Sequence, residues 1–200
     1  AEALALQCRS YGVDAQVIQG DFSSVESVLH FCQNYKKNFS ETYALINNVG
    51  NYFIESSLNT PIETWTDLFQ VNVHAPFILS QQLTPLFNKE KGRIINIGVS
   101  GLLRHSANTY STAYNLTKEC LWGMTKSLAL ELAPQSVTVN MVSPGILDIS
   151  VEIPKNLSII PMNKLGSSIE VTNAVLFLLN QSNDYITGQN IEVAGGLGLK

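Results

Sequence analysis

The chain has 200 residues, of which 45% are hydrophobic and 14% are charged, and its formal net charge at pH 7 is −4. This composition indicates one globular domain with a sizeable core and excludes a disordered chain. The acidic balance, without any basic run, argues against nucleic acid or an anionic membrane as a partner. The apolar runs are too short to span a bilayer, and no N-terminal signal pattern is visible, so we expect no membrane association.

The three cysteines are Cys8, Cys32 and Cys120. They are scattered and show no spacing that is typical of metal ligands, so we expect no metal site. Each falls in a helical pattern beside apolar residues, which predicts reduced, buried or half-buried thiols in a cytoplasmic protein.

The first third of the chain alternates helical and strand-like patterns. Residues 1–11 predict a helix that stops at Gly12, and residues 15–20 predict a short buried strand. Ser23 or Ser24 would cap a helix that runs to about residue 38. Residues 43–46 predict another buried strand, and a turn-forming cluster at 47–50 follows its carboxyl end, which is where open α/β sheets bind ligands.

A long helical pattern covers residues 62–87 and contains Asn72 in an apolar surround. A buried amide must find hydrogen-bond partners, which makes Asn72 a candidate site residue. Pro76 lies four residues later and is expected to kink or divide this helix.

The second half continues the alternation of strands and helices. We expect strands at 92–97, 137–142 and 190–193, and helices at 111–133 and from Ser167 or Ser168 onward. Residues 146–166 lack clear periodicity and predict a substrate-binding or lid loop. Apolar strands that alternate with helices indicate one doubly wound, parallel α/β domain of three layers, Rossmann-like, over residues 1–200.

Tyr114 and Lys118 stand four residues apart in the predicted helix 111–133, so they share one helix face. A nearby cation lowers the pKa of a phenol and improves it as a general acid at neutral pH. The pair is also compatible with an amphipathic helix that carries a half-buried tyrosine and a snorkelling lysine. Whether the pair is catalytic or structural therefore depends on the other motifs in the sequence.

The companions occur in a fixed order, namely Asn47-Asn48-Val49-Gly50, Asn72, Ser100, Tyr114 with Lys118, and Pro144-Gly145. With the tail 185–196 (Tyr-Ile-Thr-Gly-Gln to Val-Ala-Gly-Gly), this set resembles the short-chain dehydrogenase/reductase family over nearly the whole chain. Within the family it is most similar to the 3-oxoacyl-acyl-carrier-protein reductase branch. The resemblance implies hydride transfer between NAD(P)H and a carbonyl, with NADP slightly favoured over NAD.

The resemblance also implies a role for each matching residue. Tyr114 would protonate the developing alkoxide, and Lys118 would lower its pKa and bind the cofactor ribose. Asn72 would hold a water that links Lys118 to solvent, and Ser100 would bind the substrate oxygen. The other cofactor-binding residues implied are Asp21, Phe22, Asn47, Gly50, Pro144, Gly145 and Leu147. The implied substrate is a small or acyl-carrier-bound carbonyl compound, and the implied assembly is a homo-oligomer, a dimer or a tetramer.

The chain departs from the family pattern at several positions. In the family the catalytic serine usually lies thirteen residues before the tyrosine, and this chain has Gly101 there. Ser100 lies one position earlier. If the serine is instead located by its distance from the end of the strand 92–97, its position is taken by Val99. Ile149 stands where a threonine often contacts the carboxamide, and Ser150 is a possible substitute. Ala194 replaces a common aspartate.

The glycine-rich turn that begins the family fold does not occur in these 200 residues. We therefore expect the chain to lack the first βαβ unit, roughly 40–50 residues. Two alternatives stay open: a reductase of a pterin or another small carbonyl, and a catalytically impaired binding protein on the same fold.

Overall fold

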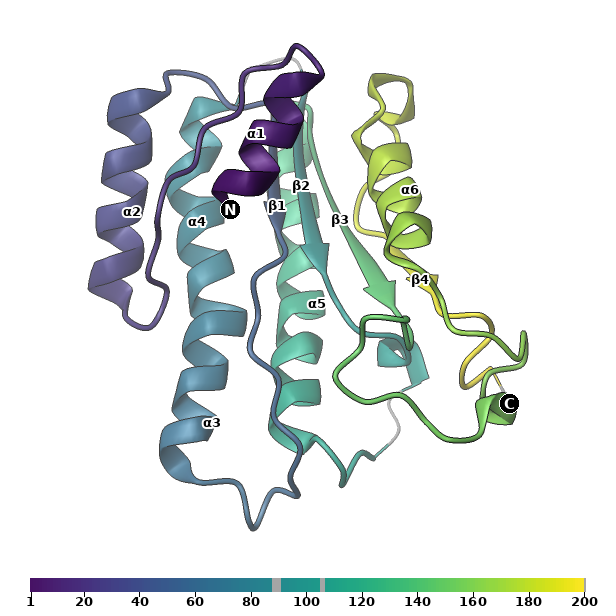
Figure 1. The fold of residues 1–200 in the computed structure, drawn as a ribbon. Coiled ribbons are helices and arrows are strands. Elements are labelled where there is room, and N and C mark those ends of the chain that lie inside the picture. The colour runs from purple at the N-terminus through teal and green to yellow at the C-terminus, as the bar shows by residue number, and fades with distance from the viewer. Residues whose placement is uncertain (88–90, 105–106, 200) are drawn as a thin grey trace.

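The computed structural model describes residues 1–87, 91–104 and 107–199. Its sheet has four parallel strands in the order β1 (Ala44–Asn47), β2 (Gly92–Ile97), β3 (Val137–Pro144) and β4 (Asn190–Val193) (Figure 1). Strand order follows chain order, and each connection between parallel neighbours carries at least one helix. The predicted parallel α/β fold is confirmed.

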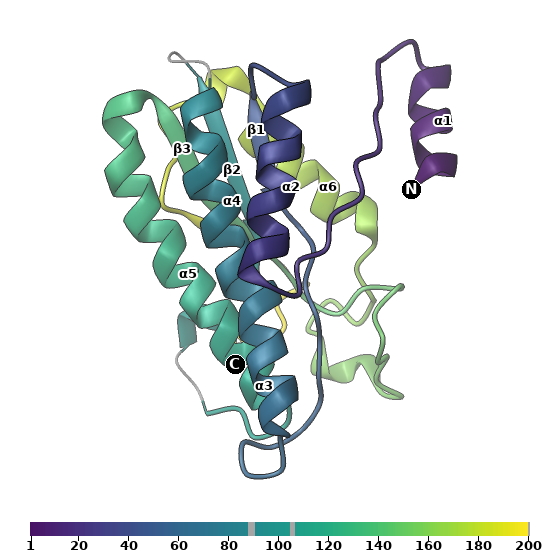
Figure 2. The same ribbon diagram turned by 90° about the vertical axis from the view of Figure 1, so that its left-hand side faces the viewer.

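The α-helices in the described residues are α1 (Glu2–Ser10), α2 (Val25–Asn38), α3 (Ile62–Phe69), α4 (Ala75–Leu83), α5 (Thr112–Leu132) and α6 (Ser168–Leu179). Successive residues of β2 point to opposite faces of the sheet: Ile94 packs in the cluster with α5, whereas Ile95 packs in the cluster with α6. Helices α2, α4 and α5 lie together on one side, and α1 stands clear of them (Figure 2). The result is the expected three-layer arrangement.

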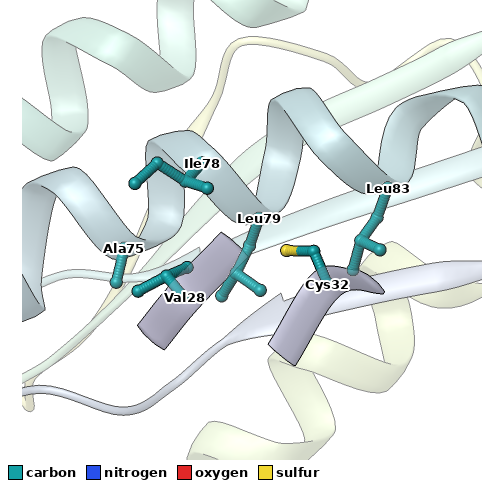
Figure 3. Packing of buried hydrophobic residues seen from close by; sticks show 6 residues of the cluster. All are labelled: Val28, Cys32, Ala75, Ile78, Leu79 and Leu83. Carbon is teal, nitrogen blue, oxygen red and sulfur yellow. The ribbon is translucent and has the colours of Figure 1, made fainter. Parts of the chain in front are cut away.

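Helix α2 is tied to α4 by an apolar cluster rather than by the sheet alone. Val28 and Cys32 of α2 pack against Ala75, Ile78, Leu79 and Leu83 of α4 (Figure 3). A capping box between Ser24 and Ser27 starts α2 at the position that the sequence suggested. Cys32 is buried as expected, whereas Cys120 lies exposed on α5, which corrects the prediction that all three thiols are buried or half-buried.

Residues 15–20 are not a strand, which corrects another prediction. A strand is stabilised by a hydrogen-bonded neighbour and by burial of its side chains. None of the sheet pairings includes this segment, and Val17 is 38% exposed. The segment therefore remains extended without joining the sheet.

The long helix predicted over 62–87 is interrupted between α3 and α4 by a π-helical turn, Gln70–His74. The N–H of Ala75 donates to the carbonyl of Gln70, five residues earlier. Pro76 has no N–H to give to the carbonyl of Asn72, so a regular α-helical pattern cannot continue through this point. Such turns are common at functional sites, and this one carries Asn72.

Within the described ranges, no helix is long and apolar enough to cross a membrane. The cytoplasmic location stays a prediction.

Candidate active site

A cavity of about 440 Å³ opens at the carboxyl ends of β1, β2 and β3, beside the first turns of α5. Its wall includes backbone and side chains from the loops after all three strands. The residues that argue for its function are Gly50, Ser100, Tyr114, Lys118, Pro144, Gly145 and Leu147. The structure thus brings most of the predicted site residues into one place, where parallel α/β sheets bind their ligands.

Tyr114 and Lys118 both belong to the first two turns of α5, which begins directly after Ser111. The Lys118 ammonium lies 5.7 Å from the centroid of the Tyr114 ring. It donates a hydrogen bond of 2.8 Å to the carbonyl of Ile97 at the end of β2, and the lysine is only 4% exposed. The predicted helix and the shared face of the pair are therefore both present.

Burial dominates the proton affinity of both groups. It lowers the pKa of Lys118 to about 8, because the charged ammonium loses water. Burial, with a smaller contribution from the neighbouring phenol of Tyr52, raises the pKa of Tyr114 to about 12. The predicted lowering of the Tyr114 pKa by Lys118 is therefore not seen in this structure. The phenol instead holds its proton throughout the neutral range.

Asn72 is 1% exposed and uses its amide within the protein. Its Oδ1 accepts from the N–H of Asn51 at 2.8 Å, and its Nδ2 donates to the carbonyl of Asn51 at 2.9 Å and to Thr117 Oγ1 at 3.0 Å. These bonds join the π turn to the loop after β1 and to α5. They satisfy the requirement for partners that the sequence raised, and the predicted water bridge to Lys118 stays a prediction.

Glycine backbone forms part of the cavity wall. A Cβ at Gly50 would lie 3.1 Å from Asn72 Oδ1 and 3.4 Å from Lys118 Nζ, and one at Gly98 would lie 2.5 Å from Ser143 Oγ. Glycine at these positions lets the side chains of Asn72, Lys118 and Ser143 pack close to the backbone of the wall. Together with the Lys118 ammonium and the polar backbone of 144–147, this wall fits the nicotinamide and ribose of a dinucleotide.

The serine position is rearranged. Val99 and Ser100 both line the cavity, but Val99 also packs against an apolar cluster with Leu102 and Met141 and has no hydroxyl to offer, so Ser100 supplies the hydroxyl here. Gly101 adopts φ +95°, and its N–H donates to Glu192. Ser150 also lines the cavity, with its Oγ accepting from the Leu147 N–H, while Ile149 is 72% exposed. The use of Ser150 in place of the missing threonine stays a prediction.

Three predicted cofactor residues lie outside this cavity. Phe22 and Asn47 line a second, apolar cavity of about 230 Å³ between β1, α2 and α4, and Asn48 borders both cavities. Asn47 is buried; its Nδ2 donates to Asn96 Oδ1, and its own Oδ1 has no partner among the described residues. Asp21 is exposed, and the N–H of Ser23 donates to its carboxylate and lowers its pKa.

Several cavity residues were missed by the sequence analysis. They are Tyr52, Asn108, Ser111, Asn115 and Glu152. Ser111 was identified only as the start of the helix, although its Oγ accepts from Asn115 Nδ2 at 2.7 Å. Tyr52 and Glu152 come from irregular loops, where no periodicity marks the direction of a side chain.

A doubly wound parallel sheet with a buried tyrosine–lysine pair at its carboxyl edge defines a class of Rossmann-like oxidoreductases. A family model described as Enoyl-(Acyl carrier protein) reductase matches residues 2–198. The chain belongs to the short-chain dehydrogenase/reductase family and is an NAD(P)-dependent oxidoreductase.

Similar curated proteins carry one name, 3-oxoacyl-[acyl-carrier-protein] reductase FabG. The protein from Buchnera aphidicola subsp. Baizongia pistaciae is 37% identical over 80% of this chain and 68% of its own length. The protein from Aquifex aeolicus is 35% identical over 98% of this chain and 82% of its own length. These likenesses agree with the branch that the sequence resembled.

Solved structures show the same fold. A blue fluorescent protein from a metagenomic library, in complex with NADPH, has a TM-score of 0.90 and 26% identity, over 99% of this chain and 82% of its own. Acetoin dehydrogenase YohF from Salmonella typhimurium has a TM-score of 0.83 and 30% identity, over 100% of this chain and 81% of its own. A short chain dehydrogenase from Burkholderia cenocepacia J2315, in complex with NADP, has a TM-score of 0.89 and 25% identity, over 98% and 82%.

Proposed function

We propose that this protein reduces the keto group of a 3-oxoacyl thioester to a hydroxyl with NAD(P)H. The observation that carries the proposal is the placement of Tyr114 and Lys118 on one wall of the strand-end cavity, with Ser100 on the same cavity. The names of the relatives support the substrate class, and they support an acyl carrier as the form in which the substrate arrives.

In the proposed reaction the reduced cofactor supplies a hydride to the carbonyl carbon. Tyr114 supplies the proton to the oxygen, because its pKa, raised to about 12, keeps the phenol protonated at neutral pH. The raised pKa also makes the phenol a weak acid, so proton transfer needs a nearby positive charge that stabilises the phenolate. Lys118, anchored to the Ile97 carbonyl, places a positive charge near the phenolate that then forms. The hydroxyl of Ser100 binds the substrate oxygen where negative charge develops.

The cofactor would lie along the strand ends. Gly50, Pro144, Gly145 and Leu147 would hold the nicotinamide end, and Lys118 and Tyr114 would face its ribose. Asp21, Phe22 and Asn47 would lie toward the adenine end, since the cavity that Phe22 and Asn47 line borders on Asn48. The NADPH and NADP complexes of similar proteins favour NADP.

Residues 146–166 would act as the substrate loop. The first part of this segment lines the cavity at Ile146, Leu147, Ser150, Val151 and Glu152. The carbonyl of Ile146 accepts from the Gly166 N–H, and the Asp148 N–H donates to the Gly166 carbonyl, so the two ends of the loop are joined. We also propose that the protein forms a homo-oligomer, and that Asn72 holds a water that links Lys118 to solvent.

The test is Tyr114→Phe in the full chain. This substitution keeps the ring but removes the proton donor, so NAD(P)H-dependent reduction of a 3-oxoacyl thioester should fall by at least about 100-fold. The dinucleotide Kd should stay within about twofold, because the cofactor contacts are retained. Tyr185→Phe is the matched control, since that side chain is fully exposed. Unchanged turnover in Tyr114→Phe would refute the mechanism.

The rearranged serine position motivates a second candidate. Because Val99 supplies no hydroxyl and Ser100 takes its place, the substrate could be a pterin or another small carbonyl compound. Turnover of a dihydropterin or a small diketone, with none of the thioester, would favour this candidate. Absence of saturable dinucleotide binding would instead favour an impaired binding protein on the reductase fold.

A further inference from the structure

A second phenol lies against the proposed proton donor. The rings of Tyr52 and Tyr114 meet edge to face, with centroids 4.7 Å apart and planes at 88°. Both residues line the strand-end cavity, and Tyr52 is 41% exposed. Edge-to-face pairs have a preferred geometry, so this contact restrains the orientation of both rings.

Tyr52 is itself held in place through the chain. It follows directly after Asn51, whose N–H and carbonyl are both bound by the amide of Asn72. The loop between β1 and α3 has no regular secondary structure at these residues, so such side-chain contacts restrain it, and the Tyr52 hydroxyl also has a hydrogen bond with Ser111. A continuous series of contacts therefore connects the π turn, through Asn51 and Tyr52, to the ring of Tyr114.

We propose that Tyr52 is a positioning residue, which fixes the orientation of the Tyr114 phenol against the substrate. The inference rests on the proposed role of Tyr114 as the proton donor. Tyr52 acts through Tyr114, whose hydroxyl must point at the developing alkoxide for proton transfer to be efficient.

The charged and titratable groups around Tyr114 are few. Lys118 lies on its own helix, Tyr52 packs on it from the loop after β1, and Glu152 approaches Tyr52 from the substrate loop. Glu152 also accepts a hydrogen bond from Tyr110, an exposed phenol that does not line the cavity. Because the Tyr52 phenol raises the pKa of Tyr114, removing its hydroxyl should lower that pKa.

The first experiment separates the ring of Tyr52 from its hydroxyl in the full chain. Tyr52→Phe keeps the ring contact, so kcat and KM for the thioester should stay within about twofold of the wild type. Tyr52→Leu removes the ring, and kcat should fall about tenfold while KM and the dinucleotide Kd change less than about twofold. Tyr110→Phe, outside the cavity and not packed on Tyr114, is the control and should keep kcat. An undiminished kcat in folded Tyr52→Leu would overturn the proposal.

The second experiment needs no substrate. Ionisation of Tyr114 is followed by NMR of ¹³Cζ-labelled tyrosine up to about pH 11.5, with Tyr114→Phe used to assign the signal. In Tyr52→Phe the ionisation of Tyr114 should begin at lower pH than in the wild type, and in Tyr110→Phe it should not move. An unshifted signal in Tyr52→Phe would show that the Tyr52 phenol does not lie against Tyr114 in solution, and would count against the contact on which the proposal rests. If the wild type does not reduce the thioester, the proposed function is refuted. The NMR measurement of the Tyr114 ionisation does not depend on that reaction and still tests the contact between Tyr52 and Tyr114.

Discussion

At the scale of single residues, the buried ammonium of Lys118 combines a functional position with a cost in stability. The side chain is 4% exposed, and burial lowers its pKa from 10.5 to about 8. Between these two values the unfolded chain holds a proton that the folded protein has lost. The free energy of unfolding therefore increases as the pH rises through this window, by about 3 kcal/mol in full. Below pH 8 the cost of burying the charge is complete.

Lys118→Met should reveal this cost. The methionine has a similar length but no charge, so thioester reduction should fall by at least about 100-fold. The stability of the wild type relative to the variant should increase by roughly 2–3 kcal/mol between pH 7 and pH 10. The raised pKa of Tyr114 lowers the stability of the folded protein as the pH rises above about 10, in the wild type and in the variant alike. It therefore does not interfere with the comparison between pH 7 and pH 10.

Urea unfolding at both pH values measures this difference. Lys126→Met is the control, because Lys126 is an exposed lysine on the same helix, and it should show no such change with pH. A pH-independent difference between Lys118→Met and the wild type would mean that the ammonium is well solvated.

At the scale of elements, the π turn, the loop after β1 and the start of α5 form one hydrogen-bonded unit. Asn72 binds the backbone of Asn51 on one side and Thr117 on the other, and Thr117 in turn donates to the carbonyl of Tyr114. A similar row of side chains crosses the sheet, from Asn47 to Asn96 to Thr125 of α5. Buried amides thus fix the cavity wall where regular backbone pairing ends.

Asn72→Ala should release the loop. The N–H of Asn51 loses its acceptor, so its hydrogen exchange should speed up at least about tenfold, and kcat should fall with it. Thr117→Val is the matched control, because it removes one bond of Asn72 but leaves both bonds to Asn51. Exchange at Asn51 should be unchanged in that variant. Equal protection in Asn72→Ala and the wild type would show that other contacts hold the loop.

At the scale of the whole molecule, the sequence predicted the parallel sheet, α5 and some of the residues that line the cavity, namely Ser100, Tyr114, Lys118, Pro144 and Gly145. These elements have strong apolar patterns, and their ends carry the polar residues that meet at one edge. The prediction of a strand at 15–20 was wrong, because the apolar residues of a segment do not show whether another strand lies beside it to form hydrogen bonds. Tyr52 and the tyrosine pKa were missed because ring contacts and desolvation depend on long-range packing that no local pattern encodes.

The assembly of the molecule is the remaining whole-molecule prediction. The family resemblance pairs the helices that hold Asn72 and Tyr114 between subunits. On α5, Leu121 is 1% exposed and belongs to the core, whereas Leu130 is 79% exposed. Leu130→Glu should therefore shift the proposed homo-oligomer toward smaller species in sedimentation velocity, since a buried charge disfavours the contact. Leu58→Glu, in the loop before α3, is the control and should not shift the distribution.

The two ends of the substrate loop, residues 146–166, are joined to each other, and this bears on how the protein can be engineered. Leu147 and Gly166 pair as an isolated bridge, so the chain leaves the catalytic wall and returns to it at nearly the same point. The segment between them contributes to the cavity mouth but not to the sheet, and the cost of closing a loop depends only weakly on its length. The far part of the segment still contacts the domain, because Ile160 is buried and the Met162 N–H donates to the Gly195 carbonyl. Changes of substrate preference are therefore expected at the cavity-lining positions Val151 and Glu152, with the strands of the catalytic wall unaltered.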